Sequence, residues 1–214
     1  MKKILPLLLC SLVAFSACKM EDSYTQTNVQ DLVTVKGDNL VNDYGYVLTV
    51  TQDAVGRSNW QIEGARYFAL FDILNRQFDI SLKEMVRSIE SVVWEYDETV
   101  EYATDPVSPF MVTFSGGYLN LGLEIAKVKK SDNAHPIRFY YELDNSVMKL
   151  HVVHDGDGED LRNWPKDDLD YVDRVYHISN EVFDGCTKIS LIWHYLDTDA
   201  SGNPVLKEST YDFR

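Results

Sequence analysis

Basic side chains are scarce in this sequence. Its 214 residues include 20 Lys and Arg against 34 Asp and Glu, which gives a formal net charge of −14 at pH 7. Because affinity for nucleic-acid phosphates is built from clustered Lys and Arg, this balance argues against a general nucleic-acid-binding protein. The 45% hydrophobic and 12% aromatic content excludes a disordered chain and predicts a globular one.

Catalytic motifs are also missing from the sequence. It has no Gly-x-Ser-x-Gly motif, no glycine-rich phosphate loop and no cysteine and histidine arranged as a nucleophile with its base. The many carboxylates leave a glycoside-hydrolase pair open, since separation in space is not visible in a sequence. Such acids are usually solvated surface groups, so we expect a protein that is not an enzyme and has no cofactor.

An apolar run, interrupted only by Pro6 and Ser11, lies at the N-terminus. It covers Ile4–Ala14 and follows the positive start made by Lys2 and Lys3. A bilayer-spanning helix needs ~20 apolar residues, so the run is too short to span a membrane. Its length and its positive flank are typical of a secretory signal, and we predict a signal peptide over residues 1–17.

The residues at the end of this signal resemble the lipobox of bacterial lipoproteins. Ser16 and Ala17 are small and directly precede Cys18, whereas Phe15 departs from the Leu, Val or Ile usual at its position. In that family the chain is cut before the cysteine and the thiol is diacylated, which implies that Cys18 is the lipid-attachment site. Two or three acyl chains anchor a protein stably. We expect an outer-membrane lipoprotein of the bacterial cell envelope, with an ordinary signal peptide as the alternative.

The segment behind the cysteine is polar. Residues 18–30 are predicted to be a flexible tether. Lys19 followed by Glu21 and Asp22 is similar to an acidic export tag that sends some lipoproteins to the cell surface, so periplasm-facing and surface-exposed positions both stay open. Removal of the two leader lysines makes the mature net charge −16.

The three cysteines supply no internal disulfide. Cys10 leaves with the signal and Cys18 would carry the lipid, so Cys186 has no partner. The fold must therefore rest on burial, which a chain of this length can provide. We expect Cys186 to be a small, half-buried residue and not a nucleophile.

After residue 30, apolar and polar residues mostly alternate, which is the period of β-strands. One segment breaks the pattern: from Ser81 the apolar residues fall at helical spacing behind a capping box made with Glu84, so a short helix is expected over 81–90. We predict a first domain over 31–105, a small OB-like barrel with one short helix. Its strands are expected near residues 32–35, 44–50, 66–73 and 92–102.

The second domain is predicted over residues 106–214. The segment Asp105–Pro109 marks the boundary, because its two prolines stop both strand and helix. Seven strand signals follow, which predict an immunoglobulin-like antiparallel β-sandwich without the Cys…Trp…Cys signature of antibody domains. They lie at residues 110–114, 118–127, 137–143, 147–154, 172–178, 188–196 and 205–213.

Four tracts of the sequence resemble the NigD-like lipoproteins. They are Gly64–Ile73, Gly117–Leu121, Arg138–Leu143 and Leu150–Gly158. With the lipobox, this resemblance extends over nearly all of the mature chain. It implies an N-terminal OB domain, a C-terminal sandwich and no established enzyme activity. It also implies a link to bacteriocin immunity, the role proposed for the protein that gave the family its name.

All five histidines fall in the second domain, at His135, His151, His154, His177 and His194. His151 and His154 stand beside acids, which is a pattern for a metal site. Residues three apart on a strand face opposite ways, however, and a third zinc ligand cannot be placed. We therefore expect no zinc site.

The acidic loop after these histidines is a better metal candidate. Asp155, Asp157, Glu159 and Asp160 offer oxygen ligands at near-alternate positions with glycines between them, as calcium loops do. The EF-hand order is not met, because Asp160 stands where its glycine belongs and Lys166 where its glutamate belongs. A solvated hairpin loop is the more common explanation of such a stretch, and calcium binding stays open.

Thirteen tyrosines and four tryptophans could form a platform for sugars. Aromatic residues are also typical of strands and of sandwich cores. Trp164, in a loop, is the aromatic that we most expect to be exposed as a partner contact, and Tyr171 is the second.

The sequence as a whole predicts a non-catalytic, lipid-anchored envelope protein, monomeric, that binds a protein, peptide or glycan. Bacteriocin immunity is the role that the resemblance implies, and the negative charge would favour capture of a cationic peptide. The alternative is a carbohydrate- or calcium-binding accessory lipoprotein of a nutrient-uptake system.

Overall fold

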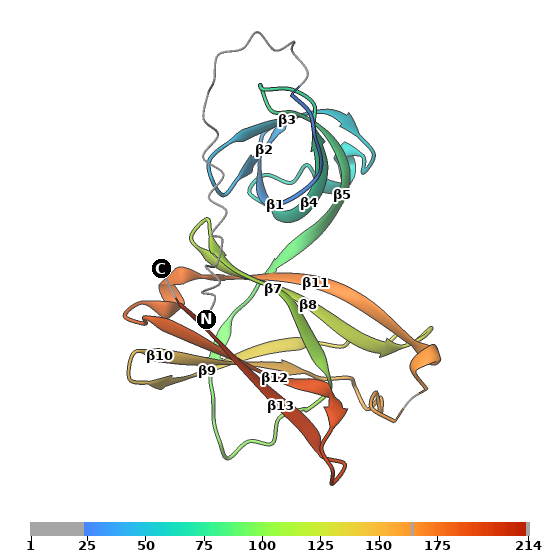
Figure 1. Cartoon of the computed structure of the whole chain (residues 1–214), viewed down its shortest axis with the longest axis vertical. Coiled ribbons are helices and arrows are strands. Elements are labelled where there is room, and N and C mark those ends of the chain that lie inside the picture. The colour runs from blue at the N-terminus through green and yellow to red at the C-terminus, as the bar shows by residue number, and fades with distance from the viewer. Residues whose placement is uncertain (1–23, 164, 213–214) are drawn as a thin grey trace, which may run out of the picture.

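The protein is built almost entirely of β-strands arranged in two sheets (Figure 1). This computed structural model describes residues 24–163 and 165–212. The predicted signal peptide, Cys18 and Trp164 lie outside the described residues. The all-β class is confirmed. No helix in the described ranges has both the length and the apolar character needed to cross a membrane.

Five strands make up the N-terminal part. They are β1 (Gln26–Lys36), β2 (Asn39–Asn42), β3 (Val47–Asp53), β4 (Arg66–Ile73) and β5 (Asp79–Glu90). Antiparallel pairings give the order β3-β2-β1-β4-β5, and a parallel pairing of β3 with β5 joins the two ends. These strands therefore form a closed ring, which we call the β-ring, and Figure 1 shows them curling around one another.

The interior of the β-ring is an apolar core. A one-turn helix, α1 (Arg57–Trp60), follows β3 and places the fully buried Trp60 inside it. On β4 the inward side chains alternate with outward ones, as expected for a strand with one face on a core. The core also contains Val33, Val35, Leu40, Leu48, Tyr67, Ala69, Phe71, Ile80 and Leu82.

The helix predicted over 81–90 is wrong, because these residues belong to β5. Lys83 is an extra residue in the pairing between β4 and β5, a β-bulge that shifts the alternation by one position. Leu82 and Met85, which pack on the core of the β-ring, are therefore three residues apart and not two. Val86 is exposed on the outer side, so the strand carries apolar residues at spacings that imitate a helix.

Eight strands make up the C-terminal part, which we call the sandwich. One of its layers contains β7 (Val107–Ser115), β8 (Tyr118–Val128) and β11 (Leu169–Ser179). The other contains β6 (Val93–Glu95), β9 (Ile137–Asp144), β10 (Val147–His154), β12 (Lys188–Thr198) and β13 (Pro204–Asp212). Two short 3-10 turns, η1 (Lys166–Asp168) and η2 (Asn180–Phe183), flank β11.

All seven strands predicted after residue 106 are present, and their apolar side chains form one core between the layers. The expectation of purely antiparallel pairing is wrong, because β10 pairs with β12 in parallel and β6 pairs with β9 in parallel. The reason is the path of the chain, which leaves β10 for the opposite layer, forms β11 there and returns to β12.

The change from the β-ring to the sandwich comes earlier than predicted. The end of β5 pairs in parallel with β11, with Ser88 opposite Val175 and Glu90 opposite His177. The first sheet thus runs without a break from the β-ring into the sandwich (Figure 1). The chain then enters the second layer at β6, so Asp105–Pro109 marks the start of β7 and not a change of domain. The predicted tether is shorter as well, since β1 begins at Gln26.

Candidate functional site

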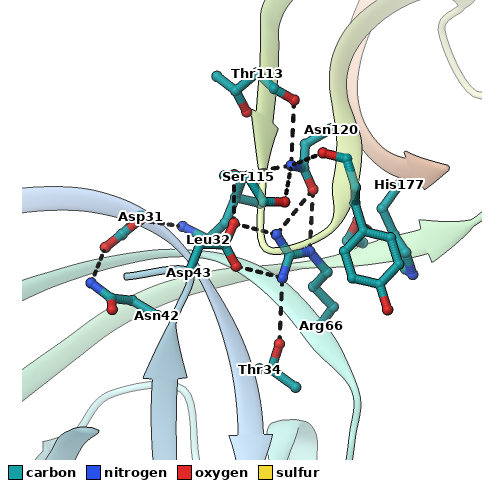
Figure 2. Close-up of polar contacts among 12 residues, drawn as sticks. Asp31, Leu32, Thr34, Asn42, Asp43, Arg66, Thr113, Ser115, Asn120 and His177 are labelled. Carbon is teal, nitrogen blue, oxygen red and sulfur yellow. Dashed lines mark hydrogen bonds and ion pairs between the residues drawn. The ribbon is translucent and has the colours of Figure 1, made fainter. Parts of the chain in front are cut away.

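A buried ion pair lies where the β-ring meets the sandwich. Arg66, the first residue of β4, donates from its two terminal nitrogens to both carboxylate oxygens of Asp43, at 2.7 and 2.5 Å. Each side chain is 5% exposed. Asp43 belongs to the turn between β2 and β3, so both members of the pair come from the β-ring (Figure 2). Two-point contacts of this kind are the strongest and most directional of protein ion pairs.

The sandwich completes the hydrogen bonds of this pair. The side-chain oxygen of Asn120, on β8, accepts from Nε of Arg66 at 3.2 Å and from a terminal nitrogen at 3.1 Å. The Ser115 hydroxyl donates to Asp43 at 2.5 Å and accepts from the Asn120 amide at 3.2 Å (Figure 2). Since buried charges are tolerated only when their hydrogen bonds are met, the contact fixes the sandwich hairpin on the β-ring.

The tip of that hairpin has to be glycine. Gly116 and Gly117 both have positive φ, 60° and 83°, as the tight turn between β7 and β8 requires. A Cβ atom at Gly116 would lie 2.4 Å from a carboxylate oxygen of Asp43. Any side chain here would separate the hairpin from the ion pair.

A second set of contacts flanks the arginine. The guanidinium carbon of Arg66 lies 5.0 Å from the ring centroid of Tyr118, and Tyr118 meets His177 edge to face. His177 Nδ1 lies 2.9 Å from the Ser88 hydroxyl of β5. Burial, and secondly the charge of Arg66, lower the pKa of His177 below its ordinary value.

A groove opens beside this contact, between the outer wall of the β-ring and the sandwich. Its cavity has a volume of about 530 Å³. The volume falls in the range of protein ligand sites, which often lie between domains. It is lined by Gln30, Phe68, Leu70, Glu84, Met85, Val86, Phe110, Met111, Asp173 and Val175.

One wall of the groove is the outer face of the β-ring. Phe68 of β4 lies opposite Val86 of β5, and Leu70 lies opposite Glu84. Both β4 residues face away from the core of the β-ring, where outward side chains are normally polar. The apolar wall thus has no role inside the β-ring and is available to the groove.

The other wall is formed by a bulge in β7. Phe110 is the extra residue where the pairing of β7 with β8 shifts, and it is 48% exposed. Its ring lies on Gly122, where a Cβ atom would come within 2.5 Å of the ring edge. Bulges re-aim side chains in this way, and here the bulge directs an aromatic ring to the groove.

The groove continues toward the buried ion pair. A second cavity of about 190 Å³ shares Gln30, Phe68 and Met111 with the first and reaches Asp43. Asp31 also lines it, and burial raises the pKa of that carboxyl. The groove is therefore continuous with the Arg66–Asp43 contact that joins the β-ring to the sandwich.

The acidic loop does not form a ligand set. Glu159 accepts the backbone N–H of Val128 at 2.8 Å and the hydroxyl of Ser131, and it lies 3.3 Å from Nε2 of the buried His135. Asp155 turns toward Arg138, at 3.7 Å. Asp160 accepts from the Asn163 amide, and Asp157 is exposed. Within the described ranges, no group of three or more His, Cys, Asp or Glu is placed to hold a metal ion.

His151 and His154 lie in separate environments, in agreement with the strand argument. His151 bonds to Glu142 at 3.1 Å, whereas His154 is buried and donates to the Pro106 carbonyl at 2.7 Å. His154 Nε2 also lies 3.2 Å from His135 Nδ1. Burial lowers the pKa of both His151 and His154.

Tyr171 is 48% exposed, as expected, and lines a small cavity of about 70 Å³ with Tyr195 and Glu124. That cavity is far smaller than the groove. The half-buried position of Cys186 is confirmed, and burial raises the pKa of its thiol. Sequence reasoning missed the groove and the ion pair.

A closed ring of five strands, joined to a β-sandwich by a buried polar contact and flanked by a groove, defines a two-part all-β fold. Solved structures share this fold. A NigD-like immunity protein from Bacteroides caccae matches with a TM-score of 0.59 and 17% identity, covering 87% of this chain and 98% of that one. At this identity the likeness shows the fold alone, and at that level the resemblance to NigD-like proteins is confirmed.

Two further solved structures have a similar fold. A protein of unknown function from Bacteroides vulgatus matches with a TM-score of 0.63 and 14% identity, over 88% of this chain and 90% of its own. A "Putative lipoprotein" from Bacteroides fragilis matches with a TM-score of 0.60 and 11% identity, over 88% and 99%. No model of a known protein family matches the sequence, and no curated protein matches it.

Replacing Arg66 should strongly destabilise the fold. Arg66→Met leaves the Asp43 carboxylate buried without its counter-charge, and the expected loss is about 3–5 kcal/mol in denaturant unfolding. Arg57→Met is the matched control, because Arg57 pairs with Asp38 on the surface, where both side chains are at least half exposed. That change should cost less than about 1 kcal/mol. Equal losses at the two positions would contradict the structural role of Arg66.

The interface histidine should make the protein less stable in acid. Because the pKa of His177 is lowered by folding, the unfolded chain takes up a proton first as pH falls. The contribution of the neutral His177 to the free energy of unfolding is therefore fully present above about pH 6.5 and is lost progressively below it. His177→Gln does not titrate there, so urea unfolding at about pH 7.5 and about pH 5 should differ less than in the wild type. An unchanged pH dependence would show that His177 does not contribute.

Proposed function

We propose that this chain is a non-catalytic, lipid-anchored protein of the bacterial cell envelope that binds a peptide or protein segment in the groove. The single observation that carries this proposal is the cavity of about 530 Å³ between the β-ring and the sandwich. Its walls come from different parts of the fold, and the contact of Arg66 and Asp43 with the sandwich hairpin holds them in register. Preformed apolar sites between domains are typical of ligand binding.

The proposed cellular location of the protein rests on its N-terminal sequence. The apolar run ends at Cys18 in a lipobox-like sequence, and a structure of the same fold carries the description "Putative lipoprotein". Both support a cell-envelope lipoprotein, which we place in the outer membrane, facing the periplasm or the cell surface. The closed pairing of β1–β5, with a single parallel contact between β3 and β5, supports an OB-like barrel for the β-ring.

Immunity is the biological role that this proposal favours. A neighbour in fold is described as a NigD-like immunity protein, and a binding protein anchored at the envelope could intercept a toxin before it reaches its target. The role needs an occupied binding site and no chemistry. The absence of catalytic motifs from the sequence is consistent with that.

A glycan-binding function is the second candidate, and one cluster of aromatics favours it. Trp94 of β6 is 48% exposed and lies opposite Tyr140 of β9, while Tyr96 stacks between Tyr102 and His151. An exposed tryptophan beside tyrosines is a surface on which a sugar ring can stack. This cluster lies on the second layer of the sandwich and shares no residue with the groove, so variants of the groove distinguish the two functions.

Photo-crosslinking tests the groove. A benzoyl-phenylalanine placed at Phe110 in producing cells should give one adduct of defined mass, because this side chain lines the groove. The same residue at Leu206, which is 57% exposed on β13, is the matched control and should give none. Val86→Arg, which fills the groove, should remove the adduct. No adduct at position 110, or equal labelling at 206, would refute binding in the groove.

Removal of the anchor should release the protein. Cys18→Ala is expected to move the chain from the membrane fraction to the soluble fraction, because the acyl chains supply its membrane affinity. Cys186→Ala controls for loss of a thiol and should stay with the membrane. Mass spectrometry of the wild type should find acyl groups on the N-terminal peptide. A free amine there, or a membrane-bound Cys18→Ala variant, would overturn the anchoring.

A further inference from the structure

We infer that the occupant of the groove is a cationic amphipathic peptide segment, whose basic side chains contact Glu84 and Asp173 and whose apolar side chains pack on Phe68, Val86 and Phe110. This inference rests on the proposed function and adds the chemistry of the partner. It is carried by charge complementarity along the groove and by the repulsion between Asp173 and Glu124 at its edge.

The charged groups of the groove have one sign. Among the described residues that line the larger cavity, only Glu84 and Asp173 are charged. Glu84 comes from β5 of the β-ring and Asp173 from β11 of the sandwich, so there is an acid on each side. Neither carboxylate takes part in an ion pair with another described residue.

The nearest basic residues on these strands are directed elsewhere. Lys83, next to Glu84, pairs with Asp72 at 2.7 Å and donates to Asn28. Arg174, next to Asp173, donates to the backbone carbonyls of Ala134 and His135. Arg87 lies opposite Tyr67, whose side chain belongs to the core of the β-ring. The negative charge of the groove is therefore not neutralised from within the chain.

Two acids at opposed positions of neighbouring strands add a second, independent observation. Asp173 lies directly opposite Glu124 of β8 in the antiparallel pairing. Like charges at directly opposed positions destabilise a sheet, and no ion pair among the described residues offsets them. A bound cation at Asp173 would relieve this repulsion, so binding energy is available here to a basic side chain.

The apolar walls of the groove determine which uncharged side chains the partner needs. Phe68, Val86 and Phe110 face the groove from both parts, and a purely polar cation would leave them uncovered. A peptide with alternating basic and apolar residues matches both features. The mature charge of −16 would also speed the approach of such a segment through long-range attraction.

Three synthetic peptides of equal length and identical apolar residues, with Lys, Gln or Glu at the other positions, provide the test. Each is titrated against the full mature protein in detergent. The Lys peptide should bind, and its affinity should fall as salt concentration rises. The double variant E84K/D173K should weaken it at least about tenfold. E101K/D132K changes the net charge equally at exposed acids outside the groove, and it should retain the affinity within about threefold.

A conservative variant guards against misfolding. Asp173→Asn removes the repulsion with Glu124, so the ligand-free protein should unfold at a higher denaturant concentration while its affinity for the Lys peptide falls. A merely structural Asp173 would lose stability on this change.

The outcomes separate this inference from the proposed function. If the Gln or Glu peptide binds as tightly as the Lys peptide, or E101K/D132K weakens binding as much as E84K/D173K, the cationic partner is refuted. If none of the peptides binds, the inference fails as well. In each of these cases the cross-link at position 110 still decides whether the groove is occupied.

Discussion

The arrangement of this protein depends on one buried ion pair whose hydrogen bonds are completed from across the interface. Burying Arg66 and Asp43 within the β-ring alone would leave donors and acceptors without partners, at a cost of several kcal/mol. Asn120 and Ser115 of the sandwich supply what is missing. The polar contact therefore stabilises the interface only in one geometry. Because the two walls of the groove lie on either side of this contact, the contact also fixes their relative position.

The groove itself is made by departures from regular β-structure. The bulge in β7 directs Phe110 onto Gly122, and the bulge in β5 shifts its alternation so that Val86 and Glu84 face outward. Without the bulge in β5, regular alternation would have turned Glu84 and Val86 toward the core of the β-ring. Together with Phe68 and Leu70 of β4, Val86 gives the outside of the β-ring an apolar surface that lines the groove.

Much of the fold could be predicted from the sequence, because a strand with one buried face shows a period of two. The strand Arg66–Ile73 and the seven strands of the sandwich followed from that period. The period fails on β5, where one inserted residue changes the spacing. The prolines at 106 and 109 mark the start of β7, whereas the passage from the β-ring to the sandwich comes earlier, at the end of β5. The site could not be predicted, because Asp43, Arg66 and Asn120 are far apart in the chain and each is unremarkable locally.

The strand β5 has a consequence for how the molecule is made. Its first half closes the β-ring with partners that precede it, but its last residues pair with Val175–His177, near the end of the chain. During synthesis the early segments emerge first, so the β-ring can close while the tip of β5 still presents an open edge. Such edges invite non-native pairing until a late partner arrives. Assembly of the two parts is therefore ordered in time, and the exposed end of β5 is the stretch that a chaperone would have most reason to shield.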